Sequence, residues 1–168
     1  MDLIVSLREA VKADAAVIAN YAGDYEVARM VATIPHPYSL QDAYDFIDII
    51  SAQQKLGQGH SLIIARNDQI TGMIGWFYND ENMLEIGYWV ARKFWGQGIA
   101  GKAVQLIIDL IRIECPDDTH VLAQYMNENP ASGRVLEKNG FVSDGGGDVC
   151  FSLARGEARP ATRMIKKL

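Results

Sequence analysis

The sequence has little of what marks secreted, membrane-spanning or metal-binding proteins. Its 168 residues include two cysteines, too few for a disulfide framework, and neither Cys115 nor Cys150 lies in a metal-ligand spacing. No apolar run is long enough to cross a bilayer, and no segment has the layout of a signal peptide. These absences predict a cytoplasmic protein with no metal site and no membrane partner.

An excess of positive charge is also missing. The chain carries 16 Lys and Arg against 21 Asp and Glu, a net charge of −5, and no basic stripe precedes its C-terminal tail. Non-specific nucleic-acid binding requires such a stripe, so we expect no nucleic-acid partner. A mildly acidic surface instead favours a cationic amine ligand by electrostatic steering.

What is present is an ordinary soluble composition, 49% hydrophobic and 22% charged. The length suits one domain over residues 1–168 with a sizeable core. Hydrophobic periodicity predicts an α+β protein with a central mixed sheet. We expect strands at 3–8, 61–66, 69–78, 84–90 and 120–126. We expect helices at 12–22, 25–33, 39–56, 100–113 and from Pro130. Residues 141–144 and 149–155 are expected to form a closing hairpin, which is followed by a weakly patterned basic tail.

The most informative segment is a Gly-rich turn, FWGQGIAGKA at 94–103, that runs from the strand at 84–90 directly into a helix. Such a turn leaves several backbone N–H groups unpaired and pointing the same way at the positive end of the helix dipole, which suits a pyrophosphate. A plain connecting turn would use the same glycines, so both interpretations stay open from this segment alone. The Gly-Lys-Ser/Thr ending of a P-loop is absent, and a dinucleotide fingerprint would follow the first strand.

A second segment, NENPASGRVLEKNGF at 127–141, reads as a short helix with Asn129 as its cap and Pro130 at its first position. Together and in this order, the two segments resemble the acyl-CoA-binding core of the GNAT superfamily of N-acetyltransferases. The closer resemblance is to the RimJ/RimL-like branch, which acetylates ribosomal-protein amino termini. Most of the superfamily has Gln or Arg three residues before Gly98, whereas this chain has Trp95, and an aromatic residue there is typical of that branch.

The resemblance covers nearly the whole chain and implies the GNAT fold, a twisted and mostly antiparallel sheet flanked by helices. It implies acetyl-CoA as co-substrate and no metal. The backbone of Trp89 and Val90 would pair with the pantetheine arm and the thioester carbonyl, and Asn129 would hydrogen-bond the pantetheine, with Ser132 near the sulfur. The turn that would hold the pyrophosphate comprises Trp95, Gly96, Gln97, Gly98, Ile99 and Ala100.

The sequence offers several candidates for the catalytic acid and base. Many relatives have a tyrosine acid where this chain has Leu136, so Ser132 or a water is the substitute, with Tyr125 a weaker one. Glu85 opens the strand that leads to the thioester site and is the candidate general base, although a solvated surface carboxylate is the alternative interpretation. An α-amine, with a pKa of about 7.7–8.0, needs less help from a base than a lysine amine.

The acceptor pocket is expected in the variable segment between Tyr21 and His60, where His36 and Tyr38 are candidate substrate-binding residues. The leading prediction is an acetyl-CoA-dependent N-acetyltransferase in which a primary amine attacks the thioester directly within a ternary complex. The acceptor is a protein amino terminus or a small-molecule amine, and a homodimer is left open. The alternative is a catalytically idle acyl-CoA-binding module on the same fold.

Overall fold

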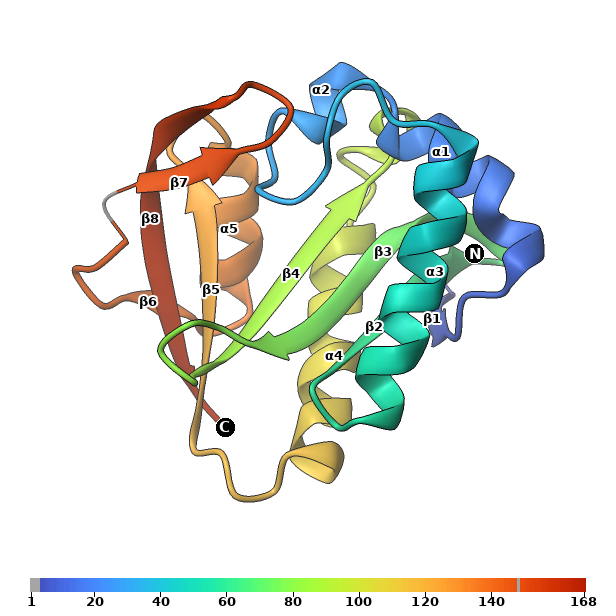
Figure 1. Cartoon of the computed structure of the whole chain (residues 1–168). Coiled ribbons are helices and arrows are strands. Elements are labelled where there is room, and N and C mark those ends of the chain that lie inside the picture. Colours follow the sequence, from blue (N-terminus) through green and yellow to red (C-terminus); the bar gives the residue numbers. More distant parts are fainter. Residues whose placement is uncertain (1–3, 148) are drawn as a thin grey trace.

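The structure, a computed structural model, describes residues 4–147 and 149–168, and it is an α+β fold built on one eight-stranded sheet (Figure 1). The strand order is β1-β2-β3-β4-β5-β8-β6, with β7 paired to β8 off this path. Among the described residues, β4 and β5 form a parallel pair and the other neighbours are antiparallel. The expected class, a mixed and mostly antiparallel sheet with flanking helices, is confirmed.

The strands are Val5–Arg8 (β1), Gly59–Arg66 (β2), Gln69–Tyr78 (β3), Leu84–Val90 (β4), His120–Met126 (β5), Val142–Ser143 (β6), Val149–Ser152 (β7) and Glu157–Lys167 (β8). The α-helices are Ala15–Ala22 (α1), Tyr25–Ala28 (α2), Leu40–Lys55 (α3), Ile99–Glu114 (α4) and Pro130–Lys138 (α5), and the short 3-10 turns are Lys12–Asp14 (η1) and Arg92–Phe94 (η2).

Helices cover both faces of the sheet (Figure 1). On one face, α1 and α3 enclose an apolar cluster with β2 and β3. On the other face, α4 and α5 pack against the larger cluster, to which β4 contributes Ile86, Tyr88 and Val90. Trp89, the intervening residue, contacts the α1 and α3 side instead. The alternation along β4 therefore determines which helical layer each of its side chains meets.

Short-range sequence signals explain two local features. The Ser39 hydroxyl accepts the Asp42 N–H at 3.1 Å and the Asp42 carboxylate accepts the Ser39 N–H at 2.6 Å, which together form a capping box at the start of α3. Asn67 and Asp68 join β2 to β3 with φ of 47° and 65°, the backbone that a two-residue hairpin turn requires. Both features depend on residues at most a few positions apart.

The basic tail after Gly156 was expected to be weakly patterned and no strand was predicted there, but it forms the 11-residue strand β8. β8 pairs with β5 along one edge and with β6 and β7 along the other. Its buried residues, Ala161 and Met164, stand among charged side chains that obscure the alternation. Strand formation here follows from partners far away in the chain rather than from local propensity.

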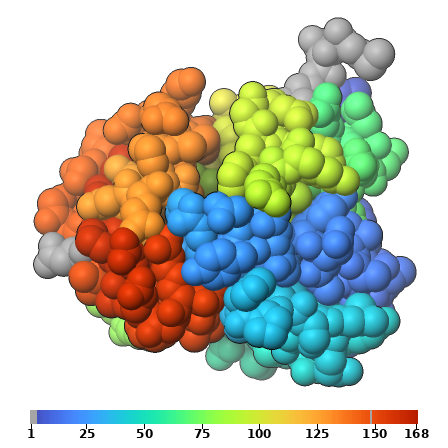
Figure 2. All heavy atoms as spheres, turned by 90° about the horizontal axis from the view of Figure 1, so that it is seen from above, coloured from blue at the N-terminus to red at the C-terminus, as the bar shows by residue number. Residues whose placement is uncertain are grey.

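The expected closing hairpin is also corrected, because β6 and β7 each pair with β8 and not with one another. In addition, α2 ends at Ala28 rather than continuing to residue 33. The backbone beyond it bonds elsewhere: Ala32 C=O accepts the Leu153 N–H at 3.1 Å, and Arg29 C=O accepts Arg155 Nε–H at 3.0 Å. Figure 2 shows this part of the chain lying against the C-terminal hairpin, which consists of β7 and β8.

Candidate active site

The parallel strands β4 and β5 separate part-way along their length, and this opening is the centre of the site. Within the described residues they pair at Glu85 and Ile86 and no further. Beyond that point β4 stays paired with β3 as far as Val90, and β5 stays paired with β8 as far as Met126. The facing edges are therefore held apart by their outer neighbours, and backbone groups on them are free to pair with an extended ligand.

A cleft of about 1420 Å³ passes through the opening. Its wall joins the Gly-rich turn and the start of α5 to the loop at 30–35 and the exposed side of α3. With one exception, His36, the sequence-predicted site residues line this single cleft: Tyr38, Glu85, Trp89, Val90, Trp95, Gly96, Gln97, Gly98, Ile99, Ala100, Asn129 and Ser132.

The Gly-rich turn forms one end of the cleft. Gly96 and Gly98 have φ of 73° and 76°, in the left-handed region that favours glycine. Gly98 is the N-cap of the 16-residue α4 and brings no capping side chain. Its C=O accepts the Lys102 N–H at 3.2 Å. The N–H groups of residues 99–101 precede that bond, have no partner within the helix and suit an anion.

Two further groups shape this end. The Trp95 indole N–H donates to the Val90 carbonyl at 2.7 Å and so ties the turn to the end of β4. From α5, Arg134 and Lys138 also line the cleft. They are the basic residues in the cleft wall of the described chain, and they lie at the end where a phosphorylated ligand would bind.

Asn129 is the N-cap of α5, and Pro130 follows at the first helical position. The Asn129 side-chain oxygen accepts the Ser132 N–H at 3.4 Å. The structural interpretation of this pair is thus confirmed. Asn129 also lines the cleft beside the open edge of β5, so a second role toward a ligand remains a prediction.

Tyr88 is a polar residue of the site to which the sequence analysis gave no chemical role. Its hydroxyl lies 2.8 Å from Ser132 Oγ and 3.3 Å from the Ser132 carbonyl oxygen, and both residues line the cleft. Burial raises the pKa of Tyr88 to about 12, and the hydrogen bond with Ser132 opposes that rise. The available signal was strand parity, since Tyr88 shares the face of Ile86 and Val90 toward α5.

Leu136 and Tyr125 show how α5 is seated. Leu136 is fully buried in the core between α4 and the sheet and does not line the cleft. A Cβ atom added to Gly133 would lie 2.7 Å from the Tyr125 ring, so glycine permits the close contact of α5 with β5. Tyr125 lines the cleft beside this contact.

Glu85 lies at the base of the opening, in the wall that continues toward α3. Asn79 Nδ2–H donates to its carboxylate at 3.0 Å. Burial raises the pKa of Glu85 above its usual value, while the Asn79 hydrogen bond and the charge of Arg163 partly oppose this rise. A half-buried carboxylate with a raised pKa is a better proton acceptor than a solvated one.

The two acceptor-pocket candidates occupy different places. Tyr38 lines the cleft. Burial, and to a smaller extent the negative charge of Asp42, raises the pKa of the Tyr38 hydroxyl to about 12. His36 packs edge-on against Tyr25, with ring centroids 5.1 Å apart, and is not part of the cleft wall. The geometry therefore favours Tyr38 over His36 as a residue that meets the acceptor.

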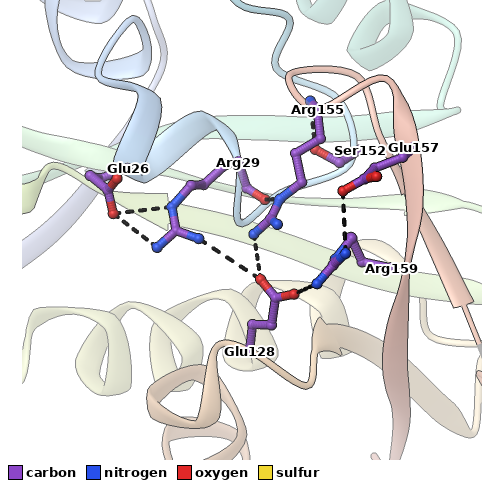
Figure 3. A network of polar contacts seen from close by, with 7 residues as sticks. All are labelled: Glu26, Arg29, Glu128, Ser152, Arg155, Glu157 and Arg159. Atoms are coloured by element: carbon purple, nitrogen blue, oxygen red, sulfur yellow. Dashed lines mark hydrogen bonds and ion pairs between the residues drawn. The ribbon is translucent and has the colours of Figure 1, made fainter.

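A network of ion pairs joins the acceptor side to the start of α5 (Figure 3). The Glu128 carboxylate, next to Asn129, lies 2.6 Å from Arg155 Nη2 and 3.8 Å from Arg29 Nη1, and it also pairs with Arg159. Arg29 follows α2, whereas the other two arginines belong to the C-terminal hairpin. One carboxylate thus holds three segments that are distant in sequence.

Within the part of the chain that the structure describes, no cluster of three or more His, Cys, Asp or Glu side chains is arranged to hold a metal ion. In the same residues, no helix has the length and apolarity needed to cross a membrane.

Comparison with known proteins gives consistent results. The profile of the acetyltransferase (GNAT) domain matches residues 5–142. A curated relative, the uncharacterized N-acetyltransferase p20 of Bacillus licheniformis, is 31% identical over 152 residues, which cover 84% of this chain and 80% of the relative.

Solved structures share the fold over almost the full chain. RimL, a ribosomal L7/L12 α-N-protein acetyltransferase solved with coenzyme A, superposes with a TM-score of 0.84 at 16% identity, covering 99% of this chain and 98% of RimL. The microcin C7 self-immunity acetyltransferase MccE, solved with acetyl-CoA and AMP, gives 0.84 at 17% identity, covering 98% and 92%. RimJ of Mycobacterium smegmatis, solved with a CoA disulfide, gives 0.80 at 20% identity, covering 97% and 81%.

Proposed function

The chain belongs to the GNAT acetyltransferase family, and we propose that it transfers the acetyl group of acetyl-CoA to a primary amine. The observation that carries this proposal is the opening between β4 and β5 beyond Ile86, inside one cleft that joins the Gly-rich turn to Glu85. A cleft of this kind holds a thioester at the opening while an amine enters from the other side. We further propose that residues 1–168 form one domain acting in the cytoplasm.

The residues present fit acetyl-CoA. The N–H groups at 99–101 and the left-handed glycines at 96 and 98 leave room for a pyrophosphate, since no atom lies within 4 Å of a Cβ added at Gly96. Arg134 and Lys138 supply positive charge near the phosphates. The open edges at 87–90 and 124–126 offer backbone partners to the amides of the pantetheine arm, with Asn129 beside them.

On the acceptor side, Glu85 accepts the proton that the amine loses as its nitrogen bonds to the acetyl carbon. The raised pKa of Glu85 makes this transfer easier than it would be to a solvated carboxylate. The backbone amide of Val90 polarises the thioester carbonyl, so most of the acceleration comes from positioning and from stabilisation of the oxyanion. The C–S bond then breaks, and the products are an amide and free coenzyme A.

An acceptor screen tests the proposal. Purified protein with acetyl-CoA should release the CoA thiol in the presence of at least one amine among polyamines, aminoglycosides, amino-acid-like compounds and peptides with free amino termini. Tight acetyl-CoA binding without turnover across this panel would identify an idle acyl-CoA-binding module instead. Absence of binding in calorimetry would contradict both functions.

A further inference from the structure

Tyr88 and Ser132 form a hydroxyl pair that reaches across the cleft. Tyr88 is near the end of β4 and Ser132 is in the first turn of α5, and their oxygen atoms lie 2.8 Å apart. The Tyr88 ring packs against the core cluster beneath α4 and α5, so its hydroxyl is held from a rigid support. The pair lies beside the opening between β4 and β5, where the proposed function places the thioester.

The reaction needs a hydrogen-bond donor at this point. Breaking the thioester leaves negative charge on sulfur, and the position where many relatives carry a tyrosine acid is Leu136, which is fully buried away from the cleft. Ser132 reaches the cleft, but a serine hydroxyl rotates freely unless a neighbour fixes it. Tyr88 is the neighbour in contact with it.

We propose that Tyr88 is a positioning residue for the transfer step: it donates its hydroxyl hydrogen to Ser132 Oγ and thereby directs the Ser132 hydroxyl hydrogen at the departing sulfur. This inference rests on the proposed acetyltransferase function. In the step, the amine nitrogen bonds to the acetyl carbon, its proton passes to Glu85, and the electron pair of the breaking C–S bond goes to sulfur. Ser132 donates a hydrogen bond to the resulting thiolate.

Neither hydroxyl loses its proton in this step. Burial raises the pKa of Tyr88 to about 12, whereas an ordinary thiol has a pKa of about 8.5, so transfer of the tyrosine proton to the thiolate would be unfavourable. Hydrogen bonding to the charged form is sufficient, because it lowers the pKa of the group that receives it. A consequence can be measured: the thiol of coenzyme A should be more acidic when bound than when free.

Three variants test the coupling: Tyr88→Phe, Ser132→Ala and the double variant. Tyr88→Phe removes one oxygen and keeps the ring in the core. It should lower kcat about tenfold, the loss expected for a hydrogen bond that supports a charged group, and leave KM for acetyl-CoA unchanged. If Tyr88 acts through Ser132, the double variant should be no slower than Ser132→Ala alone. Losses that multiply would overturn the proposal.

A spectroscopic titration gives an independent readout. The ultraviolet absorbance of the thiolate reports the thiol pKa of bound coenzyme A, which should rise by about one unit in Tyr88→Phe, a tenfold change in thiolate at fixed pH. An unchanged titration would overturn the proposal. Tyr44→Phe, in α3 and outside the cleft wall, is the matched control for loss of a tyrosine hydroxyl and should behave as the wild type.

The remaining outcomes are distinguishable. If Tyr125→Phe rather than Tyr88→Phe raises the thiol pKa, the donor is Tyr125 and the inference is wrong. Melting temperatures separate a folding defect from a catalytic one, and a destabilised Tyr88→Phe protein is still tested by the thiol titration below its transition. A wild-type protein that binds no coenzyme A, or turns over no amine, would contradict the proposed function, and the Tyr88 inference, which rests on that function, would fall with it.

Discussion

The two ends of the cleft, one proposed to bind the cofactor and the other the acceptor, differ in whether backbone or side-chain groups form them. The cofactor end consists mainly of backbone: the Gly96 and Gly98 turn, the start of α4 and the unpaired edges of β4 and β5. The acceptor end consists of side chains, chiefly Tyr38 and Glu85, on segments that meet only in the folded protein. Backbone recognition needs few particular residues, so this end keeps its role as sequences change, whereas the acceptor end can change its specificity by substitution.

The comparison predicts that a side chain placed at the backbone-built end has the largest effect. Gly98→Asp would put a carboxylate where, on our proposal, the pyrophosphate binds, and it would force a left-handed φ on a residue with a Cβ. We expect acetyl-CoA binding to fall below detection in calorimetry.

The control for this variant is Gly145→Asp, which has the same backbone strain, with φ of 79° and open space around its Cβ position, and lies outside the cleft wall. It should bind acetyl-CoA as the wild type does. Wild-type affinity in a folded Gly98→Asp protein would remove the pyrophosphate assignment.

At the side-chain-built end, Glu85→Gln keeps the size of the residue and removes its basicity. Turnover should fall roughly 10²-fold if Glu85 is the general base, with the loss shrinking at high pH as the amine deprotonates itself. Because burial raises the pKa of Glu85, wild-type activity should decline as the pH falls through a value above that of an ordinary glutamate. A pH–rate profile measures both effects.

The raised pKa of Glu85 also affects how the stability of the protein depends on pH. A carboxyl whose pKa is raised in the folded state costs stability as the pH rises above its unfolded-state pKa, and the full cost is present above the folded-state pKa. Glu85→Gln should therefore not lower the melting temperature at pH 7. Glu137→Gln, an exposed carboxylate of α5 outside the cleft wall, is the control and should keep full activity. An unchanged pH–rate profile in Glu85→Gln would return this residue to the class of surface carboxylates.

Glu128 connects the two ends of the cleft through its ion pairs. Glu128→Ala would leave three arginines without their shared partner, one of them Arg155, whose side chain is 11% exposed. We expect a loss of about 2 kcal/mol in the free energy of unfolding, less than for a fully buried pair because Glu128 is partly exposed. Denaturant unfolding measures this loss.

An exposed ion pair on α4 is the control for the Glu128 prediction. Asp109→Ala removes an exposed pair with Arg112 within α4 and should cost at most about 0.5 kcal/mol. Equal losses in the two variants would show that the Glu128 network is no stronger than one surface pair. KM values for both substrates should rise in Glu128→Ala, since the ion-pair network holds the segment that follows α2 and the start of α5 together.

The smallest effect is expected at Asn129, which belongs to the cofactor end through its side chain. Asn129→Ala removes a helix cap worth about 1 kcal/mol and, on our proposal, a hydrogen bond to pantetheine. KM for acetyl-CoA should rise clearly while the melting temperature falls only modestly. Ser39→Ala removes the cap of α3 and should lower the melting temperature alone. If both variants leave KM unchanged, Asn129 is a structural cap and nothing more.

Prediction from sequence succeeded for features that depend on neighbouring residues and failed for contacts between distant ones. The turn at 94–103, the Asn129 cap and the place of Glu85 on the strand at 84–90 were all expected, since each depends on residues close in sequence. The Tyr88 and Ser132 pair joins residues 44 positions apart, and the Arg155 contact with Arg29 spans 126 positions. Neither could be read from local spacing, because long-range pairing leaves no periodic pattern of its own.

The sequence by itself determined the caps of α3 and α5, the hairpin turn at Asn67 and Asp68, and the Gly-rich turn before α4, because backbone propensity and capping act over a few residues. Only the tertiary structure decided that residues 157–167 form β8 and that β4 and β5 part beyond Ile86. Both depend on which strands lie next to one another. That choice is made when the whole core packs, so the site itself is a product of the fold.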